Sequence, residues 1–255
     1  MPKIFIDPGH GGSDTANRGP TGYVEAYGVL DIALRLKDLL APSYDVLLSR
    51  ELDITLSLED RTNKANAWGA DFLVSIHTNA ASPEAKGVET WHSKNGEWGT
   101  RFSDQAKRVA GAIQAELVAV TGLRDRGIKT RLVDNPGSPI HGLDYYAVIR
   151  KAKCPAIIIE AGFHTNPQEE ALLKTSEFRQ KVAGAIAAGI KKVCPVETLT
   201  SDIKEMPVQF GDRRLQGYLI NGVGYAPIRD LVTALNERSQ LKLGWDDATK
   251  TAVIK

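Results

Sequence analysis

The side chains best suited to chemistry in this chain are histidines and glutamates at the ends of apolar segments. His10 follows the run "IFIDPG", and His77 follows the run "FLVSI". Glu160 closes the run "AIIIE", and Glu25 opens a stretch with helical periodicity. In a mostly parallel sheet the carboxyl ends of the strands share one edge, where the ligand sites of open α/β folds gather. We therefore expect these side chains to meet at that edge.

Two histidines and two glutamates from separate segments suit metal-assisted hydrolysis. Catalytic zinc is typically held by three protein ligands, with His₂Glu among the known combinations, and keeps a fourth position for water. A further carboxylate outside the metal shell can take the proton of that water and pass it to the leaving amine. In this interpretation His10, Glu25 and His77 hold the metal, and Glu160 is the base.

The same residues also have ordinary structural explanations. A histidine at a strand end is often a hydrogen-bonded part of the fold, and a glutamate in a first helical turn interacts favourably with the helix dipole. Glu160 is harder to explain in this way, because a carboxylate that closes an apolar strand is costly without a partner. The sequence has no compact zinc motif such as His-Glu-x-x-His. From the residues alone, a metal hydrolase and a set of structural side chains both stay open.

The elements that would position these residues follow from the hydrophobic periodicity. Short apolar segments alternate with amphipathic stretches of helical period, which is typical of an α/β domain. The predicted strands are Lys3–Asp7, Tyr44–Ser49, Phe72–His77, Gly87–His92, Tyr146–Ile149 and Ala156–Glu160. The predicted helices are Glu25–Leu40, Leu56–Trp68, Arg101–Thr121 and Glu177–Val193. We therefore predict an open, twisted, mostly parallel sheet flanked by helices on both faces.

The pattern changes after "KKVCP", where "VETLTSDIKEMP" has the composition of a polar linker. The remaining sequence predicts a small α+β domain with a helix from Pro227 to Asn236. Its predicted strands are Val208–Phe210, Gln216–Ile220, Val223–Ala226, Leu241–Trp245 and Thr251–Ile254. The chain is therefore divided into a large domain over residues 1–194, a linker over 195–206 and a small C-terminal domain over 207–255.

Composition narrows the range of partners. The chain has 255 residues and a formal net charge of +1, and no basic stretch is interleaved with aromatic residues, so nucleic acid is not expected. No apolar run approaches the ~20 residues needed to cross a bilayer, and the first residues lack the features of a signal peptide. Cys154 and Cys194 are too few for a disulfide framework. Two buried thiols and one disulfide between them are both compatible with the sequence.

Several motifs together resemble those of a known enzyme family. They are "IFIDPGHGGSD", the downstream Glu25, "SIHTNA" and "YYAVIRKAKCPAIIIEAGFHTNP", and they resemble the zinc-dependent N-acetylmuramoyl-L-alanine amidases of the amidase-3 family. The resemblance covers about residues 1–194. It implies one zinc ion per catalytic domain, with His10, Glu25 and His77 as ligands and Glu160 as the catalytic glutamate. It also implies hydrolysis of the amide that joins N-acetylmuramic acid to L-alanine in peptidoglycan.

Further side chains are expected around this site. His141 lies in a Gly/Pro-rich loop that should border the cleft, and His164 follows the strand that carries Glu160. Together with Asn79, they are the candidates for substrate contact. Asp7 is expected to support the turn before His10 or to orient its ring, because ligating histidines usually donate their other N–H to an acceptor.

The C-terminal segments "INGVGYAPIRDLVTAL" and "LGWDDATKTAVI" resemble the small domain found at the N-terminus of some copper amine oxidases and on many Gram-positive surface proteins. This part of the chain has no histidine or cysteine for a typical copper site. The resemblance implies attachment to the cell wall, and a packing or dimerisation module is the alternative.

The sequence also supports expectations about source and activity. A wall-binding part without a signal peptide fits a phage endolysin, made in the host cytoplasm and acting on the wall after release. A secreted bacterial autolysin is the alternative source. Two other activities stay open beside the amidase, a zinc endopeptidase of the peptidoglycan stem peptides and a non-catalytic wall-binding protein. All of these hypotheses share peptidoglycan as the partner.

Overall fold

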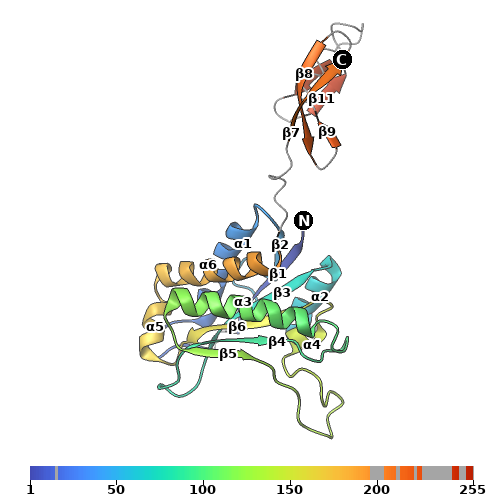
Figure 1. Ribbon diagram of the computed structural model, residues 1–255. Coiled ribbons are helices and arrows are strands. Elements are labelled where there is room, and N and C mark those ends of the chain that lie inside the picture. The colour runs from blue at the N-terminus through green and yellow to red at the C-terminus, as the bar shows by residue number, and fades with distance from the viewer. Residues whose placement is uncertain are drawn as a thin grey trace. The chain divides into compact units, whose positions relative to one another are not determined.

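The chain forms two compact units, Met1–Val196 and Glu197–Lys255 (Figure 1). The computed structural model describes residues 1–14, 17–195, 204–210, 213–220, 223–225, 243–246 and 251–254. The candidate site lies in the first unit. Within the described residues, no helix has the length and apolar character that a membrane span requires.

The first unit is built on one open sheet with the strand order β2-β1-β3-β6-β4-β5. Its strands are β1 (Lys3–Pro8), β2 (Asp45–Leu48), β3 (Phe72–Asn79), β4 (Val88–His92), β5 (Asp125–Lys129) and β6 (Ala156–Phe163). Neighbouring strands pair in parallel except β4 and β6, which are antiparallel. The predicted mostly parallel sheet is therefore confirmed, with β4 and β5 running opposite to the other four strands.

Helices cover the two faces of this sheet unequally. They are α1 (Glu25–Leu40), α2 (Leu58–Trp68), α3 (Ser103–Thr121), α4 (Ala147–Lys151), α5 (Pro167–Leu173) and α6 (Ser176–Val193). Figure 1 shows the long helices α1, α3 and α6 side by side along the sheet, and their apolar residues form the main core with it. The shorter α2 and α4 cover a second, smaller cluster around Phe5 and Leu73.

Strand alternation explains why one end of the second face is polar. Successive side chains of a strand point to opposite faces. In β3, Val74 and Ile76 therefore pack into the main core, while Leu73, Ser75 and His77 project to the other face. Only the first part of that face is covered by the smaller cluster. The polar side chains at the carboxyl ends of β1, β3 and β6 lie beyond it.

Three elements differ from the sequence-based expectation. The segment Tyr146–Ile149, predicted as a strand, is the start of helix α4, because a short apolar run does not distinguish a strand from a buried helical turn. Strand β5 was not predicted, because its residues show no apolar alternation. Helix α5 was also missed, although it had a readable start signal. Asn166 caps its first turn by accepting from Gln168 N and Glu169 N, and Pro167 follows.

The second unit contains two small antiparallel sheets. One consists of β7 (Lys204–Phe210), β8 (Arg213–Ile220) and β9 (Val223–Tyr225), and the other of β10 (Leu243–Asp246) and β11 (Thr251–Ile254). Each predicted C-terminal strand overlaps one of these. Strand β7 begins inside the segment 195–206 that was predicted as a linker, and the predicted helix over 227–236 lies outside the described residues.

Candidate active site

The first element of the site is the turn that carries His10. Strand β1 ends at Pro8, and the chain then reverses through three glycines. His10 has a φ of 57°, and no other non-glycine residue in the described ranges has a positive φ. Such a conformation is strained and persists where surrounding contacts hold it. Arg61 provides those contacts, donating from Nη1 to Pro8 O and from Nη2 to His10 O, each at 2.6 Å.

Gly9 lets this turn approach His77 closely. A Cβ atom at Gly9 would lie 2.2 Å from Cε1 of the His77 ring, well inside van der Waals contact. The backbone N–H of Gly9 donates to Ile76 O at 3.0 Å, which fixes the turn against β3. The glycine therefore serves the approach of one candidate ligand to the other.

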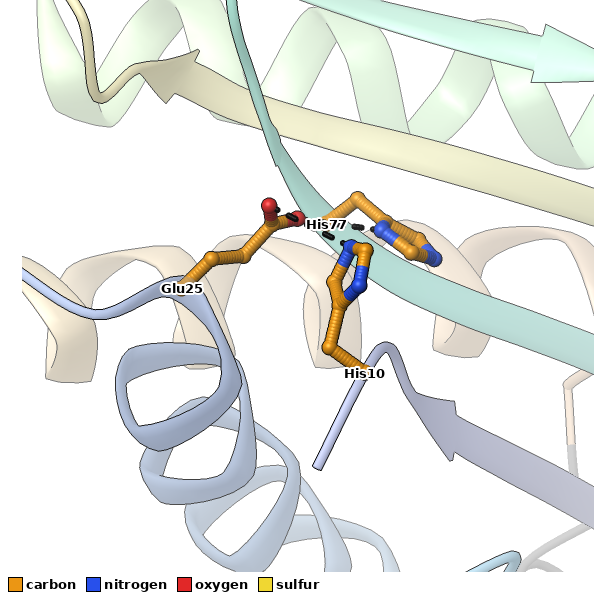
Figure 2. Close-up of side chains that lie close together, drawn as sticks. All are labelled: His10, Glu25 and His77. Carbon is orange, nitrogen blue, oxygen red and sulfur yellow. Dashed lines mark hydrogen bonds and ion pairs between the residues drawn. The ribbon is translucent and has the colours of Figure 1, made fainter. Parts of the chain in front are cut away.

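His10, Glu25 and His77 converge as predicted, from the turn after β1, the first residue of α1 and strand β3 (Figure 2). Glu25 Oε2 lies 3.3 Å from His10 Nε2, and Glu25 Oε1 lies 3.0 Å from His77 Nδ1. One donor atom from each residue lies within 4.8 Å of the others. Glu25 is 1% exposed, and its Oε2 has no hydrogen-bond partner among the described residues. A buried carboxylate that lies between two imidazoles and has one unsatisfied oxygen fits a divalent cation such as zinc.

The charges in this cluster support each other. Burial by itself would raise the pKa of Glu25, but the neighbouring His10 and His77 imidazoles hold it well below its usual range. Burial would lower the pKa of His10, yet the carboxylates of Glu25 and Asp14 together raise it. Glu25 therefore keeps the ionised form that a metal ligand needs.

Asp14, rather than Asp7, contacts the His10 ring. Its Oδ2 lies 2.8 Å from His10 Nδ1, on the opposite side of the ring from Glu25. Ligating histidines usually have such an acceptor on their second nitrogen. The sequence analysis missed Asp14, although its position four residues after His10 in the same glycine-rich turn was a usable signal.

Asp7 supports the turn through its contact with Arg61. Its buried carboxylate accepts from Ser49 Oγ and Arg61 Nη1 at 2.7 Å and from Ser75 Oγ at 2.8 Å. Burial would raise the pKa of Asp7, but the Arg61 charge and these hydrogen bonds lower it. Of the two predicted roles, the geometry fits support of the turn, through the Arg61 guanidinium that also binds the backbone of His10.

Glu160 lies in the same row of side chains as the metal cluster. It is directly opposite His77 in the β3–β6 register and opposite Glu89 in the β4–β6 register. Its Oε2 is buried and has no hydrogen-bond partner among the described residues. Burial, followed by the charges of Glu25 and Glu89, raises the pKa of Glu160 well above its usual value. This carboxyl is therefore suited to hold and release a proton.

Glu89 is a second carboxylate of the site that the sequence analysis did not identify. It is 2% exposed, and it accepts at Oε1 from Asn79 Nδ2 (2.9 Å) and Trp91 Nε1 (3.2 Å). At Oε2 it accepts from Arg126 Nε (2.6 Å) and Lys129 Nζ (2.5 Å). Burial would raise its pKa, but Arg126 and Lys129 lower it, so Glu89 is a fixed negative charge beside Glu160.

The predicted substrate contacts lie in three different environments. Asn79 ends β3 beside Glu89. His141 is exposed, and its Nδ1 accepts from Asn135 N at 3.2 Å. His164 is only 1% exposed and lies 2.9 Å from Thr78 Oγ1 and 3.9 Å from Glu25 Oε2. This burial behind Glu25 does not fit the predicted substrate contact of His164.

A cavity beside the two histidine rings gives access to the cluster. Its volume is about 270 Å³, and it is lined on one side by His10 and His77 and on the other by residues 55–58 and Arg61. Leu58 in this wall is 56% exposed. The cluster is therefore reached from the open part of the second face, between the turn after β1 and the start of α2.

Comparison with known proteins gives a consistent result. The pattern of the N-acetylmuramoyl-L-alanine amidase family Amidase_3 matches residues 4–192. The chain is 37% identical over 203 residues to the N-acetylmuramoyl-L-alanine amidase CwlM of Bacillus licheniformis, covering 75% of this chain and 68% of that protein. It is 36% identical over 205 residues to the sporulation-specific N-acetylmuramoyl-L-alanine amidase of Bacillus subtilis, covering 79% and 71%.

A solved structure also matches the first unit. The crystal structure of an N-acetylmuramoyl-L-alanine amidase from Clostridium difficile 630 is 34% identical, with a TM-score of 0.65 over 77% of this chain and 98% of that one. The structural match therefore covers the same part of the chain as the sequence match, and this part contains the cluster. The chain belongs to the Amidase_3 family of N-acetylmuramoyl-L-alanine amidases.

Proposed function

We propose that this chain hydrolyses the amide bond between N-acetylmuramic acid and L-alanine in peptidoglycan, with one zinc ion in its first unit. The observation that carries the proposal is the convergence of His10, Glu25 and His77 in the same row as Glu160, in a member of this amidase family. This is the arrangement of a metal centre with a separate proton carrier.

His10, Glu25 and His77 would hold the zinc. Their donor set of two imidazoles and one carboxylate suits a catalytic zinc, and the unpartnered Glu25 Oε2 is explained by it. When bound, zinc supplies Lewis-acid polarisation of the substrate carbonyl and makes water acidic enough to attack at neutral pH. Asp14 would fix the orientation of the His10 ring, and the turn held by Arg61 would fix its position.

Glu160 would carry the proton. It takes one proton from the attacking water and delivers it to the amide nitrogen, so that the alanine leaves as a neutral amine. A raised pKa makes the ionised carboxylate of Glu160 a stronger base for the first step, and the protonated carboxyl that results is the acid for the second. The buried Glu89 charge on its other side disfavours a permanently ionised Glu160.

A digest of purified cell walls tests the reaction. The amidase produces new N-terminal alanine and no new reducing sugar ends. New amino termini on other residues would indicate the alternative zinc endopeptidase, and no release would indicate a binding protein only. A chelator is expected to abolish the release and added zinc to restore it.

For the C-terminal segment we propose attachment to the wall. The first unit is compact by itself, so a chain ending at residue 196 can be compared with the full chain. The full chain is expected to sediment with purified walls and the shortened chain to stay in solution, with equal cleavage of a small soluble substrate. Equal sedimentation would contradict a targeting role. The phage source and the site of action stay predictions.

A further inference from the structure

A β-bulge in the edge strand β5 places two cations on the face of the active site. In the β4–β5 register Val88 opposes Asp125, but Thr90 opposes Ile128, so two residue steps on β4 match three on β5. The extra residue falls at Gly127, whose φ is 77°. Residues 126 and 129 would face opposite sides of a regular strand. Because of the bulge, Arg126 and Lys129 both reach Glu89 Oε2.

The two positive charges of Arg126 and Lys129 outnumber the single negative charge of the carboxylate that binds them. A single carboxylate, Glu89, pairs with both, and it is buried beneath them. The side chains of Arg126 and Lys129 are 28% and 30% exposed, so they reach solvent on the side away from Glu89. Arg126 bonds Glu89 through Nε alone, and its terminal nitrogens make no hydrogen bond within the described ranges. A net positive charge with free donors therefore faces outward at this edge.

The pair lies in line with the reacting groups. His77, Glu160 and Glu89 occupy one row across β3, β6 and β4. Arg126 lies at the bulge opposite Glu89 and continues this row onto β5, whereas Lys129 is opposite Trp91 and reaches the row with its side chain. Neighbouring strands are ~4.8 Å apart, so β5 is about 10 Å beyond β6. An extended peptide advances by ~3.3 Å per residue. Because the side chains of Arg126 and Lys129 reach back to Glu89, one strand from Glu160, a peptide that starts at Glu160 and follows the row meets the cations with its second or third residue.

Aromatic side chains line the same path. The Trp91 ring is 5.4 Å from the Tyr146 ring, and Lys129 Nζ is 5.4 Å from the Trp91 ring. Trp91 follows Glu89 by two residues and so lies on the same face of β4. The path from Glu160 to the cations therefore has an apolar wall, along which the backbone of a peptide can pack.

We propose that Arg126 and Lys129 form a carboxylate-binding subsite for the peptide released by the reaction. The proposal rests on the amidase function and adds the part of the substrate that this edge recognises. The acid group of muramic acid is consumed in the amide, so a free carboxylate near the reacting bond belongs to the peptide side. The subsite favours peptides with a carboxylate on the second or third residue, counted from the alanine whose amine is freed.

Matched synthetic substrates test this subsite. Muramoyl-L-alanyl tripeptides carry a carboxylate at the second or at the third residue, each compared with its carboxamide. Lys129→Gln and Arg126→Gln each remove one cation and leave the other to pair with Glu89. Lys153→Gln is the control, because Lys153 also lies over a tryptophan ring, at 4.9 Å from Trp98, but on another part of the surface.

The full-length wild type is expected to show a kcat/KM about 3- to 10-fold higher for the acid than for the amide at one of the two positions, as an ion pair of ~1 kcal/mol produces. Each subsite variant reduces this preference at least twofold, mainly through KM, and Lys153→Gln keeps it. Added salt weakens the preference in the wild type. No preference in the wild type, or equal losses on acid and amide in the variants, would overturn the subsite. Failure to cleave any of the substrates would instead contradict the amidase function.

Discussion

Glu89 and Glu160 face each other across strands β4 and β6, but their carboxyls have opposite surroundings. Glu89 accepts hydrogen bonds from Asn79, Trp91, Arg126 and Lys129, whereas Oε2 of Glu160 has no partner in the described part of the chain. The pKa of Glu89 is lowered and that of Glu160 is raised. One carboxylate is thus a permanent charge, and its neighbour is free to exchange a proton.

Replacing Glu160 by Gln is expected to abolish turnover while stabilising the metal-free fold at neutral pH. The folded-state pKa of Glu160 lies above the unfolded value, so the folded chain holds a proton that the unfolded chain releases as the pH rises. The wild type therefore loses stability between these two pKa values, and Glu160→Gln does not. We expect a gain of about 1–3 kcal/mol in the free energy of unfolding at pH 7, fading towards pH 4.

Urea unfolding with a chelator present, at pH 4 and at pH 7, measures this difference. Glu89→Gln is the matched control, because it removes a carboxylate that has hydrogen-bond partners, and it should destabilise the fold at pH 7. A Glu160→Gln variant that kept wild-type cleavage would rule out Glu160 as the proton carrier.

Asp14→Asn is expected to weaken zinc binding about 10- to 100-fold, because the second nitrogen of His10 loses its charged acceptor. Competition with a chromogenic chelator measures the affinity. The control is Asp38→Asn, an exposed carboxylate on α1. Unchanged affinity in Asp14→Asn would show that the Asp14 contact does not orient the ligand.

Gly9→Ala is expected to displace the His77 ring, since the new Cβ would lie 2.2 Å from Cε1. Zinc affinity should fall sharply, and the fold should become less stable. Gly111→Ala in α3 is the comparison, because a Cβ there meets no atom within 4 Å. This control should gain about 0.5–1 kcal/mol from helix propensity. Wild-type zinc affinity in Gly9→Ala would mean that the turn and β3 can separate without loss of the cluster.

Asp7→Asn is expected to reduce the free energy of unfolding by about 3–5 kcal/mol at pH 7, because Arg61 then keeps a buried, unpaired charge. The folded-state pKa of Asp7 is below its unfolded value. Its contribution is therefore complete above the unfolded pKa and is lost as the pH falls through the folded pKa. Chemical unfolding at pH 7 and at pH 3 should show a large and then a smaller difference from wild type. A difference that does not depend on pH would exclude the ionised pair as its cause.

The sequence was most informative where strands run in parallel. His10, His77 and Glu160 could be placed together because each ends an apolar run, and β1, β3 and β6 end at one edge. Glu89 was not found, because β4 is reversed and brings its first residues to that edge. Strand direction depends on tertiary pairing, which periodicity does not contain.

Two other features depended on packing rather than on local pattern. The side chain of Arg126 reaches the site only because of the bulge at Gly127, and a lone glycine in a polar segment does not distinguish a bulge from a loop. His164 follows a predicted site strand, so substrate contact was a reasonable expectation. Its burial follows from tertiary contacts with β3, since its backbone N donates to Asn79 O and its ring contacts Thr78 Oγ1.

The reversal of β4 also determines which of its two ends lies at the active-site edge of the sheet. Glu89 at its start belongs to the hydrolytic edge, whereas Ser93 after its end donates from its backbone N to Ala156 O, at the beginning of β6. The turn that follows is exposed over residues 97–100. A fluorescent label or an affinity peptide inserted between Trp98 and Gly99 would thus sit at the opposite rim of the sheet, where it can report on the enzyme during wall digestion without obstructing the polymer.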